Sequence, residues 1–83
     1  MRRIIAEVHV PIIEEQYDIF IPNNKSIKTV IKLFEKVINE LSDGCYQIKP
    51  TTLLYNKDTG IPYDPLITVK DANIVNGTKL VLL

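Results

Sequence analysis

The chain has 83 residues, of which 46% are hydrophobic and 24% charged, which suits a single domain over residues 1–83 and is too short for two. Ten Lys and Arg balance ten Asp and Glu, and this zero net charge argues against a general nucleic-acid binder, which is normally basic. One cysteine, Cys45, cannot close an internal disulfide, so a reducing cytoplasmic location is the simplest. No stretch approaches the roughly 20 apolar residues that span a bilayer, so we expect no direct membrane insertion.

Two segments near the start of the sequence show the period-two alternation that is typical of half-buried strands. In residues 4–10, one face carries Ile4, Ala6, Val8 and Val10, and the other carries Ile5, Glu7 and His9. In residues 16–21, one face carries Tyr17, Ile19 and Ile21, and the other carries Asp18 and Phe20. Because only a short loop that begins at Pro11 separates the segments, we predict an antiparallel hairpin.

An amphipathic helix is the strongest pattern in the sequence. Ser26 is well placed as its N-cap, and Gly44 can adopt the left-handed conformation that ends a helix. Between them, one apolar stripe recurs at spacings of three and four: Ile27, Val30, Ile31, Phe34, Val37, Ile38 and Leu41. The opposite, polar face carries Lys28, Lys32, Glu35, Lys36 and Asn39. We therefore predict a helix that places one face on a core.

The second half of the sequence holds shorter elements separated by turns. Residues 53–55 form a short apolar run, and residues 61–63 suit a stub of edge strand that Pro62 limits. Residues 68–74 have the pattern of a turn or a single helical turn. Asn76 and Gly77 then predict a tight turn into a last strand over residues 78–83.

The order of these elements predicts an α+β fold. One helix cannot cover both faces of a sheet, so one sheet face should pack on the helix and the other should face water. We expect a mixed sheet of four to five strands, in the order β-β-α-β-β-β, packed on one amphipathic helix. This is the arrangement of the β-grasp.

Parts of the sequence resemble known proteins. Residues 69–74 and 76–82 resemble the last third of ubiquitin-like folds, where a short helical turn with an Asp and an Asn precedes a β-turn and a final strand. Residues 17–22 and 26–31, with the spacing of Ile74, Gly77, Leu80 and Leu82, are similar to the YukD/EsaB group. Proteins of that group are small ubiquitin-fold accessories of bacterial type VII secretion. Residues 43–65 match no motif of the group.

The end of the sequence differs from conjugating relatives. Ubiquitin-like modifiers and sulfur carriers end in an extended Gly-Gly tail, because two glycines let the carboxylate thread a narrow enzyme channel. Here the sequence ends Leu80-Val81-Leu82-Leu83, on the predicted strand itself. We therefore expect a non-conjugating protein, and a modifier or sulfur carrier is the disfavoured alternative.

The residue types that carry chemistry are scarce and scattered. His9 is the only histidine and has no second ligand nearby in the pattern, so we expect no metal site. Cys45 has no adjacent cation to activate it, and the glycines are isolated, so no nucleophile and no phosphate-cradling loop is expected. The sequence thus predicts no catalytic residue and no cofactor.

The lysines of the predicted helix allow two interpretations. Lys28, Lys32 and Lys36 are spaced by four and share one face. The simpler interpretation is a solvated helix face, with Glu35 and Glu40 nearby. The alternative is a surface that attracts an acidic partner through electrostatic steering.

The uncovered face of the sheet is the candidate binding site. If Leu53 and Tyr55 point at the helix, alternation directs outward the apolar residues Ile5, Phe20, Leu54, Val81 and Leu83. His9 lies on the same face. In the β-grasp order, the residues Ile5, Leu54, Val81 and Leu83 should lie close together. Such a cluster resembles the apolar recognition patch of ubiquitin, with Leu54 in the place of its central isoleucine, and is typical of a contact site.

The resemblance implies a function that the residues alone do not specify. It suggests a cytoplasmic, non-catalytic interaction module that acts as an accessory or regulator of a type VII secretion system. Its partners would be cytoplasmic parts of a membrane secretion assembly. A self-associating structural domain, such as a homodimer, is the other alternative.

Overall fold

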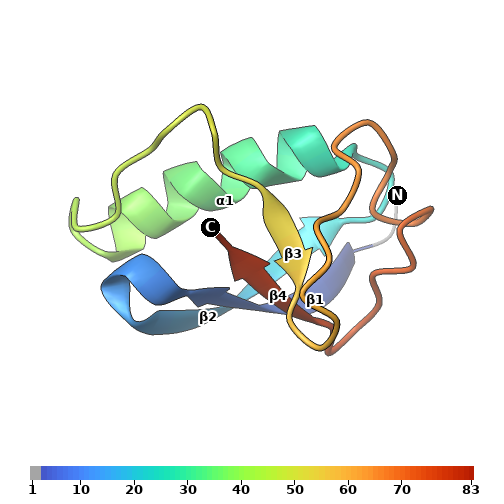
Figure 1. Cartoon of the computed structure of the whole chain (residues 1–83), viewed down its shortest axis with the longest axis horizontal. Coiled ribbons are helices and arrows are strands. Elements are labelled where there is room, and N and C mark those ends of the chain that lie inside the picture. The colour runs from blue at the N-terminus through green and yellow to red at the C-terminus, as the bar shows by residue number, and fades with distance from the viewer. Residues whose placement is uncertain (1–2) are drawn as a thin grey trace.

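The computed structural model describes residues 3–83 and contains one helix and one sheet (Figure 1). Its elements in chain order are β1 (Arg3–Val10), a short 3-10 helix (Pro11–Ile13), β2 (Glu15–Pro22), α1 (Ile27–Leu41), β3 (Leu54–Asn56) and β4 (Lys79–Leu82). The predicted hairpin, helix and last strand are thereby confirmed. Within residues 3–83, no helix has the length and apolar character needed to cross a membrane.

The sheet has four strands in the order β2-β1-β4-β3. β1 pairs with β2 antiparallel and with β4 parallel, and β3 pairs with β4 antiparallel. The sheet is therefore mixed, with the first and last strands side by side at its centre. Residues 3–83 form no fifth strand, because Pro62 makes only an isolated bridge to Tyr55 and cannot donate a ladder hydrogen bond.

The helix begins and ends where its flanking residues predict. The Ser26 hydroxyl accepts a hydrogen bond from the backbone N–H of Thr29 at 3.2 Å, which satisfies one of the free donors of the first turn. At the other end, Gly44 has a φ of 82° and donates its N–H to the carbonyl of Asn39. A left-handed residue at this place favours glycine, because a side chain would be strained there.

The core lies between α1 and one face of the sheet. The helix contributes the completely buried Ile27, Val30, Phe34 and Ile38, and the central strands contribute Ala6, Val8, Leu80 and Leu82. Figure 1 shows the helix lying across this face and leaving the other face of the sheet uncovered. The architecture is thus the predicted α+β β-grasp.

The predicted orientation of β3 is wrong by one residue. Leu54 is completely buried and pairs with Leu82, whereas Tyr55 pairs with Val81 on the outer face. All three residues of the run Leu53-Leu54-Tyr55 are apolar. Period-two alternation therefore could not indicate which of them face the core. The assignment of Leu54 to the exposed binding face is therefore corrected.

Candidate functional site

The outer face of the sheet carries a contiguous cluster of side chains from three adjacent strands. Val81 of β4 stands between His9 of β1 and Tyr55 of β3, its partners in the ladder. Leu83 lies two residues further along on the same side and is 50% exposed. We call His9, Tyr55, Val81 and Leu83 the sheet patch. Three of these residues were predicted from the sequence, and Tyr55 replaces Leu54.

Ile5 and Phe20 are not part of the sheet patch. They stand directly opposite each other on β1 and β2, and Phe20 is 63% exposed. Ile5 precedes His9 by four positions in β1, which corresponds to about 13 Å along an extended strand. The acidic pair Glu7 and Asp18 occupies the space between them. The single apolar cluster expected from the sequence is therefore wrong, and the outer face carries two separate apolar areas.

A polar pair borders the sheet patch. The imidazole Nε2 of His9 lies 2.7 Å from a carboxylate oxygen of Glu7, two residues away on the same face of β1. This hydrogen bond holds the pKa of Glu7 below its usual value of 4.5, and the positive charges of Lys79 and Lys57 act in the same direction. The pair gives one side of the patch a polar rim, as is usual for protein-binding surfaces.

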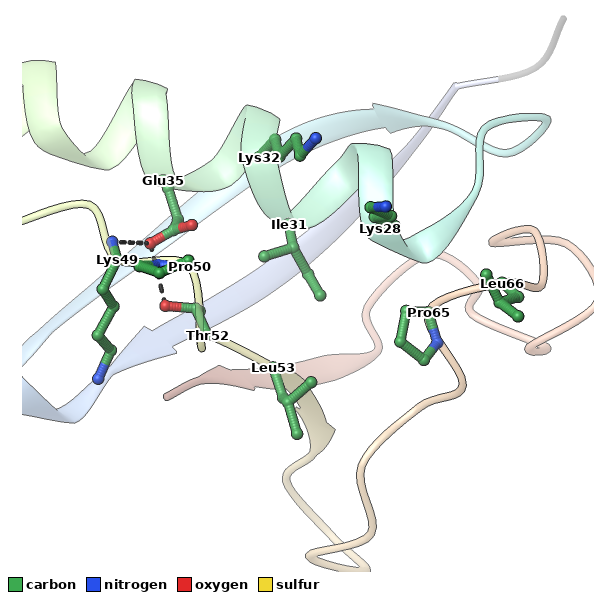
Figure 2. Close-up of a pocket in the computed structure, with 10 residues that line it drawn as sticks. All are labelled: Lys28, Ile31, Lys32, Glu35, Lys49, Pro50, Thr52, Leu53, Pro65 and Leu66. Atoms are coloured by element: carbon green, nitrogen blue, oxygen red, sulfur yellow. Dashed lines mark hydrogen bonds between the residues drawn. The ribbon is translucent and has the colours of Figure 1, made fainter.

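A second surface feature lies beside the helix. We call it the basic groove; Figure 2 shows it between α1 and two segments of the long connections. Its volume is about 330 Å³. Its lining residues are Lys28, Ile31, Lys32, Glu35, Lys49, Pro50, Thr52, Leu53, Pro65 and Leu66. Two lysines of the predicted helix stripe, Lys28 and Lys32, thus border a concave surface instead of an evenly solvated face.

Glu35 anchors one wall of this groove. The residue is only 4% exposed, and its Oε2 accepts three hydrogen bonds. The donors are the Tyr46 hydroxyl at 2.8 Å, the Thr52 hydroxyl at 3.0 Å and the Lys49 backbone N–H at 3.1 Å. Figure 2 shows the bonds from Lys49 and Thr52. A buried carboxylate is tolerated because these donors replace the water it loses.

Burial also affects Tyr46. Its side chain is almost fully buried, and loss of water raises the pKa of the phenol above its usual value of 10, with a further contribution from the carboxylate of Glu35. Tyr46 therefore stays neutral and donates to Glu35. This pairing attaches residues 42–53 to the helix, and most of them belong to the segment 43–65 that matched no motif.

The placement of Glu35 on the solvated helix face is wrong. Glu35 follows Ile31 by four residues and precedes Ile38 by three, so it lies on the edge of the apolar stripe. This spacing was the signal available in the sequence. The spacing was not interpreted as burial because a glutamate is seldom buried without partners. The partners of Glu35 come from a segment that shows no sequence pattern.

The remaining candidates for chemistry do not form a site. Residues 3–83 hold no group of three His, Cys, Asp or Glu side chains that could bind a metal ion. Cys45 is exposed in the turn after the helix. The arrangement of the described side chains suits binding through surface contacts.

Fold and topology define this chain as a ubiquitin-like β-grasp protein, and comparison with solved structures agrees. It is similar to the ubiquitin-like domain of the type VII secretion protein EccD1 from Mycobacterium tuberculosis, with a TM-score of 0.79 and 15% identity over 100% of this chain and 99% of that chain. The EccD5 ubiquitin-like domain from Mycobacterium xenopi gives a TM-score of 0.75 and 16% identity, covering 100% and 94% of the two chains.

Similarity extends beyond secretion proteins. The ubiquitin-like domain of the Arabidopsis thaliana protein At2g32350 gives a TM-score of 0.75 and 17% identity, covering 100% of this chain and 78% of that chain. In sequence comparisons, no family model and no curated protein matches. At these low identities, the structural similarity establishes the fold.

Proposed function

We propose that this chain is a non-catalytic, non-conjugating ubiquitin-like interaction module that acts in the cytoplasm as an accessory or regulator of a bacterial type VII secretion system. It binds a protein of the membrane-bound secretion assembly reversibly, through the outer face of its sheet. The residues that carry this contact are those of the sheet patch.

The observation that carries the proposal is the continuous sheet patch on a face that the helix does not cover. An apolar centre with a polar rim is the usual composition of a protein contact. Val81 and Tyr55 lie at the centre, on strands that the core holds rigid. Glu7, His9 and Lys79 lie around them, and charges at a rim set orientation and association rate more than affinity.

Two arguments support the secretion assignment. The ubiquitin-like domains of EccD1 and EccD5 share the fold over almost their whole lengths, and the first is named as part of a type VII secretion protein. A chain of the ESX-5 inner membrane complex also contains a region with this fold, at a TM-score of 0.74, 13% identity and coverage of 100% of this chain and 21% of that chain. The sequence resemblance to the YukD/EsaB group leads to the same system independently.

Copurification with the secretion assembly tests the proposal. The tagged chain is expressed in its native host, the membranes are solubilised, and secretion proteins that copurify are quantified by mass spectrometry. Val81→Asp should remove them, because a charge at the centre of the patch would have to be desolvated. Val75→Asp is the matched control, since Val75 is a loop valine that is 61% exposed and lies outside the patch.

Two results would contradict the proposal. One is copurification that survives Val81→Asp in a protein whose circular dichroism shows it is folded. The other is a dimer in light scattering that Val81→Asp dissociates, with no secretion protein captured, because the patch would then serve self-association.

A further inference from the structure

The basic groove has properties that the proposed function does not use. Lys28 and Lys32 of α1 lie along one side, and Lys49 lies at the end next to Glu35 (Figure 2). Ile31 lies between these lysines and the opposite wall, which Leu53 and Pro65 form. Cations therefore border an apolar floor.

The three lysines have no ion-pair partner among residues 3–83, where Glu7 and His9 form the only such pair. Among the residues that line the groove, the three lysines are accompanied by one carboxylate, that of Glu35, whose Oε2 accepts three hydrogen bonds. The groove therefore has an excess of positive charge that a ligand can neutralise.

The floor of the groove needs an apolar ligand group. Leu66 is 81% exposed, the highest value among the large apolar side chains of residues 3–83, and it lines the groove beside Pro65. The volume of about 330 Å³ lies at the low end of small-ligand pockets, which span about 300–1,000 Å³. Such a space suits one or two apolar side chains of a peptide.

We propose that the basic groove binds an acidic peptide segment of a partner protein, with an apolar side chain between Ile31, Leu53 and Leu66 and its carboxylates on Lys28, Lys32 and Lys49. The groove lies next to the sheet patch, because Leu53 pairs with Leu83, but it shares no residue with the patch. This binding therefore goes beyond the proposed function and does not depend on it.

Charge and shape favour this occupant over other anionic partners. Free phosphate or a nucleic acid would leave the apolar floor without a contact. An anionic membrane surface is flat, whereas the groove is concave. A peptide with both acidic and apolar side chains satisfies the cations and the floor together.

A synthetic peptide tests the proposal directly. The probe is a fluorescein-labelled peptide with two central leucines flanked by glutamates, measured by fluorescence anisotropy at low salt with the full chain. We expect saturable binding that weakens as salt screens the lysines. One comparison peptide carries serines in place of the leucines and the other carries lysines in place of the glutamates, and both should bind at least about tenfold more weakly.

Charge-reversal variants test whether the peptide binds in the basic groove. Lys28→Glu combined with Lys32→Glu should weaken binding of the acidic peptide by about tenfold or more. The matched control combines Lys36→Glu with Lys70→Glu, which makes the same charge change at two exposed lysines outside the groove and should leave affinity nearly unchanged. Val81→Asp should also leave it unchanged, which separates this test from that of the sheet patch.

Three results would overturn the proposal. One is an equal loss of affinity in both double variants, which would indicate general electrostatic attraction. Another is equal binding by the serine peptide, which would remove the role of the apolar floor. The third is tighter binding of a single-stranded oligonucleotide or of phosphatidylserine vesicles than of the acidic peptide, again dependent on Lys28 and Lys32.

Discussion

Replacing Glu35 with alanine removes the anchor that holds residues 42–53 on the helix. The substitution leaves the buried hydroxyls of Tyr46 and Thr52 and the backbone N–H of Lys49 without their shared acceptor. A hydrogen bond to a charged group contributes about 1.5–3 kcal/mol, and a buried donor left unsatisfied costs about 1–3 kcal/mol. Because the two hydroxyls lie 3.5 Å apart and can pair with each other, the losses do not add fully. We expect a net loss of about 3 kcal/mol.

Urea unfolding followed by circular dichroism measures this loss. A domain of 83 residues has a total stability of roughly 4–12 kcal/mol, so the variant should stay folded in buffer. With a slope of about 1 kcal/mol per molar urea, the midpoint should fall by about 3 M. Glu35→Gln keeps an accepting oxygen and should lose less than Glu35→Ala.

Glu40→Ala is the matched control, because Glu40 is an exposed glutamate of the same helix. Its substitution should change stability by no more than about 0.5 kcal/mol. A loss below about 1 kcal/mol for Glu35→Ala would refute the reasoning, since it would mean that the three hydrogen bonds contribute little. The variant should also weaken peptide binding in the basic groove, whose wall includes Lys49 and Thr52.

Three further predictions concern stability. Because the pKa of Tyr46 is raised in the folded state, its contribution to the free energy of unfolding is complete below pH 10 and is lost as pH rises through the folded-state pKa. The thermal midpoint should therefore fall above pH 10, and it should fall less steeply in Tyr46→Phe. The lowered pKa of Glu7 means that its contribution is present above pH 4.5 and is lost as pH falls below it, so the acid limb of the pH–stability curve should flatten in Glu7→Gln. Ser26→Ala should cost about 1 kcal/mol in urea unfolding, because the first helical turn loses its cap, and an unchanged midpoint would contradict that role.

The parts of the fold that the sequence predicted are those with long periodic patterns. The helix from Ile27 to Leu41 has a cap, a stop and several turns of apolar spacing, so local chemistry and packing agree. The hairpin has two alternating segments, residues 4–10 and 16–21, which lie within the two strands of eight residues each that the structure contains.

The parts that it did not predict depend on contacts between distant residues. β3 has only three residues, so Leu54 and Tyr55 could exchange faces without violating any pattern. The outer face was therefore assigned the wrong central residue. The separation of Ile5 from Val81 also required the pairing register of β1 with β4, which the sequence alone does not provide.

The basic groove could not be predicted from the sequence. Its lysines were visible as a stripe, but a stripe on a helix is usually solvated. The lysine stripe borders a groove only because Leu53, Pro65 and Leu66 lie opposite it, and these residues come from connections without periodicity. The burial of Glu35 could not be predicted for the same reason, since its hydrogen-bond partners are eleven to seventeen residues away in sequence.

Amide chemical-shift mapping tests the central claim most directly. The labelled chain is titrated with the purified secretion protein that copurifies with it. The account predicts that the largest shifts gather at the sheet patch, around His9, Tyr55 and Val81, and that Val81→Asp removes them. Shifts confined to the exposed side of α1 or to the region of Phe20, with none at the patch, would contradict it.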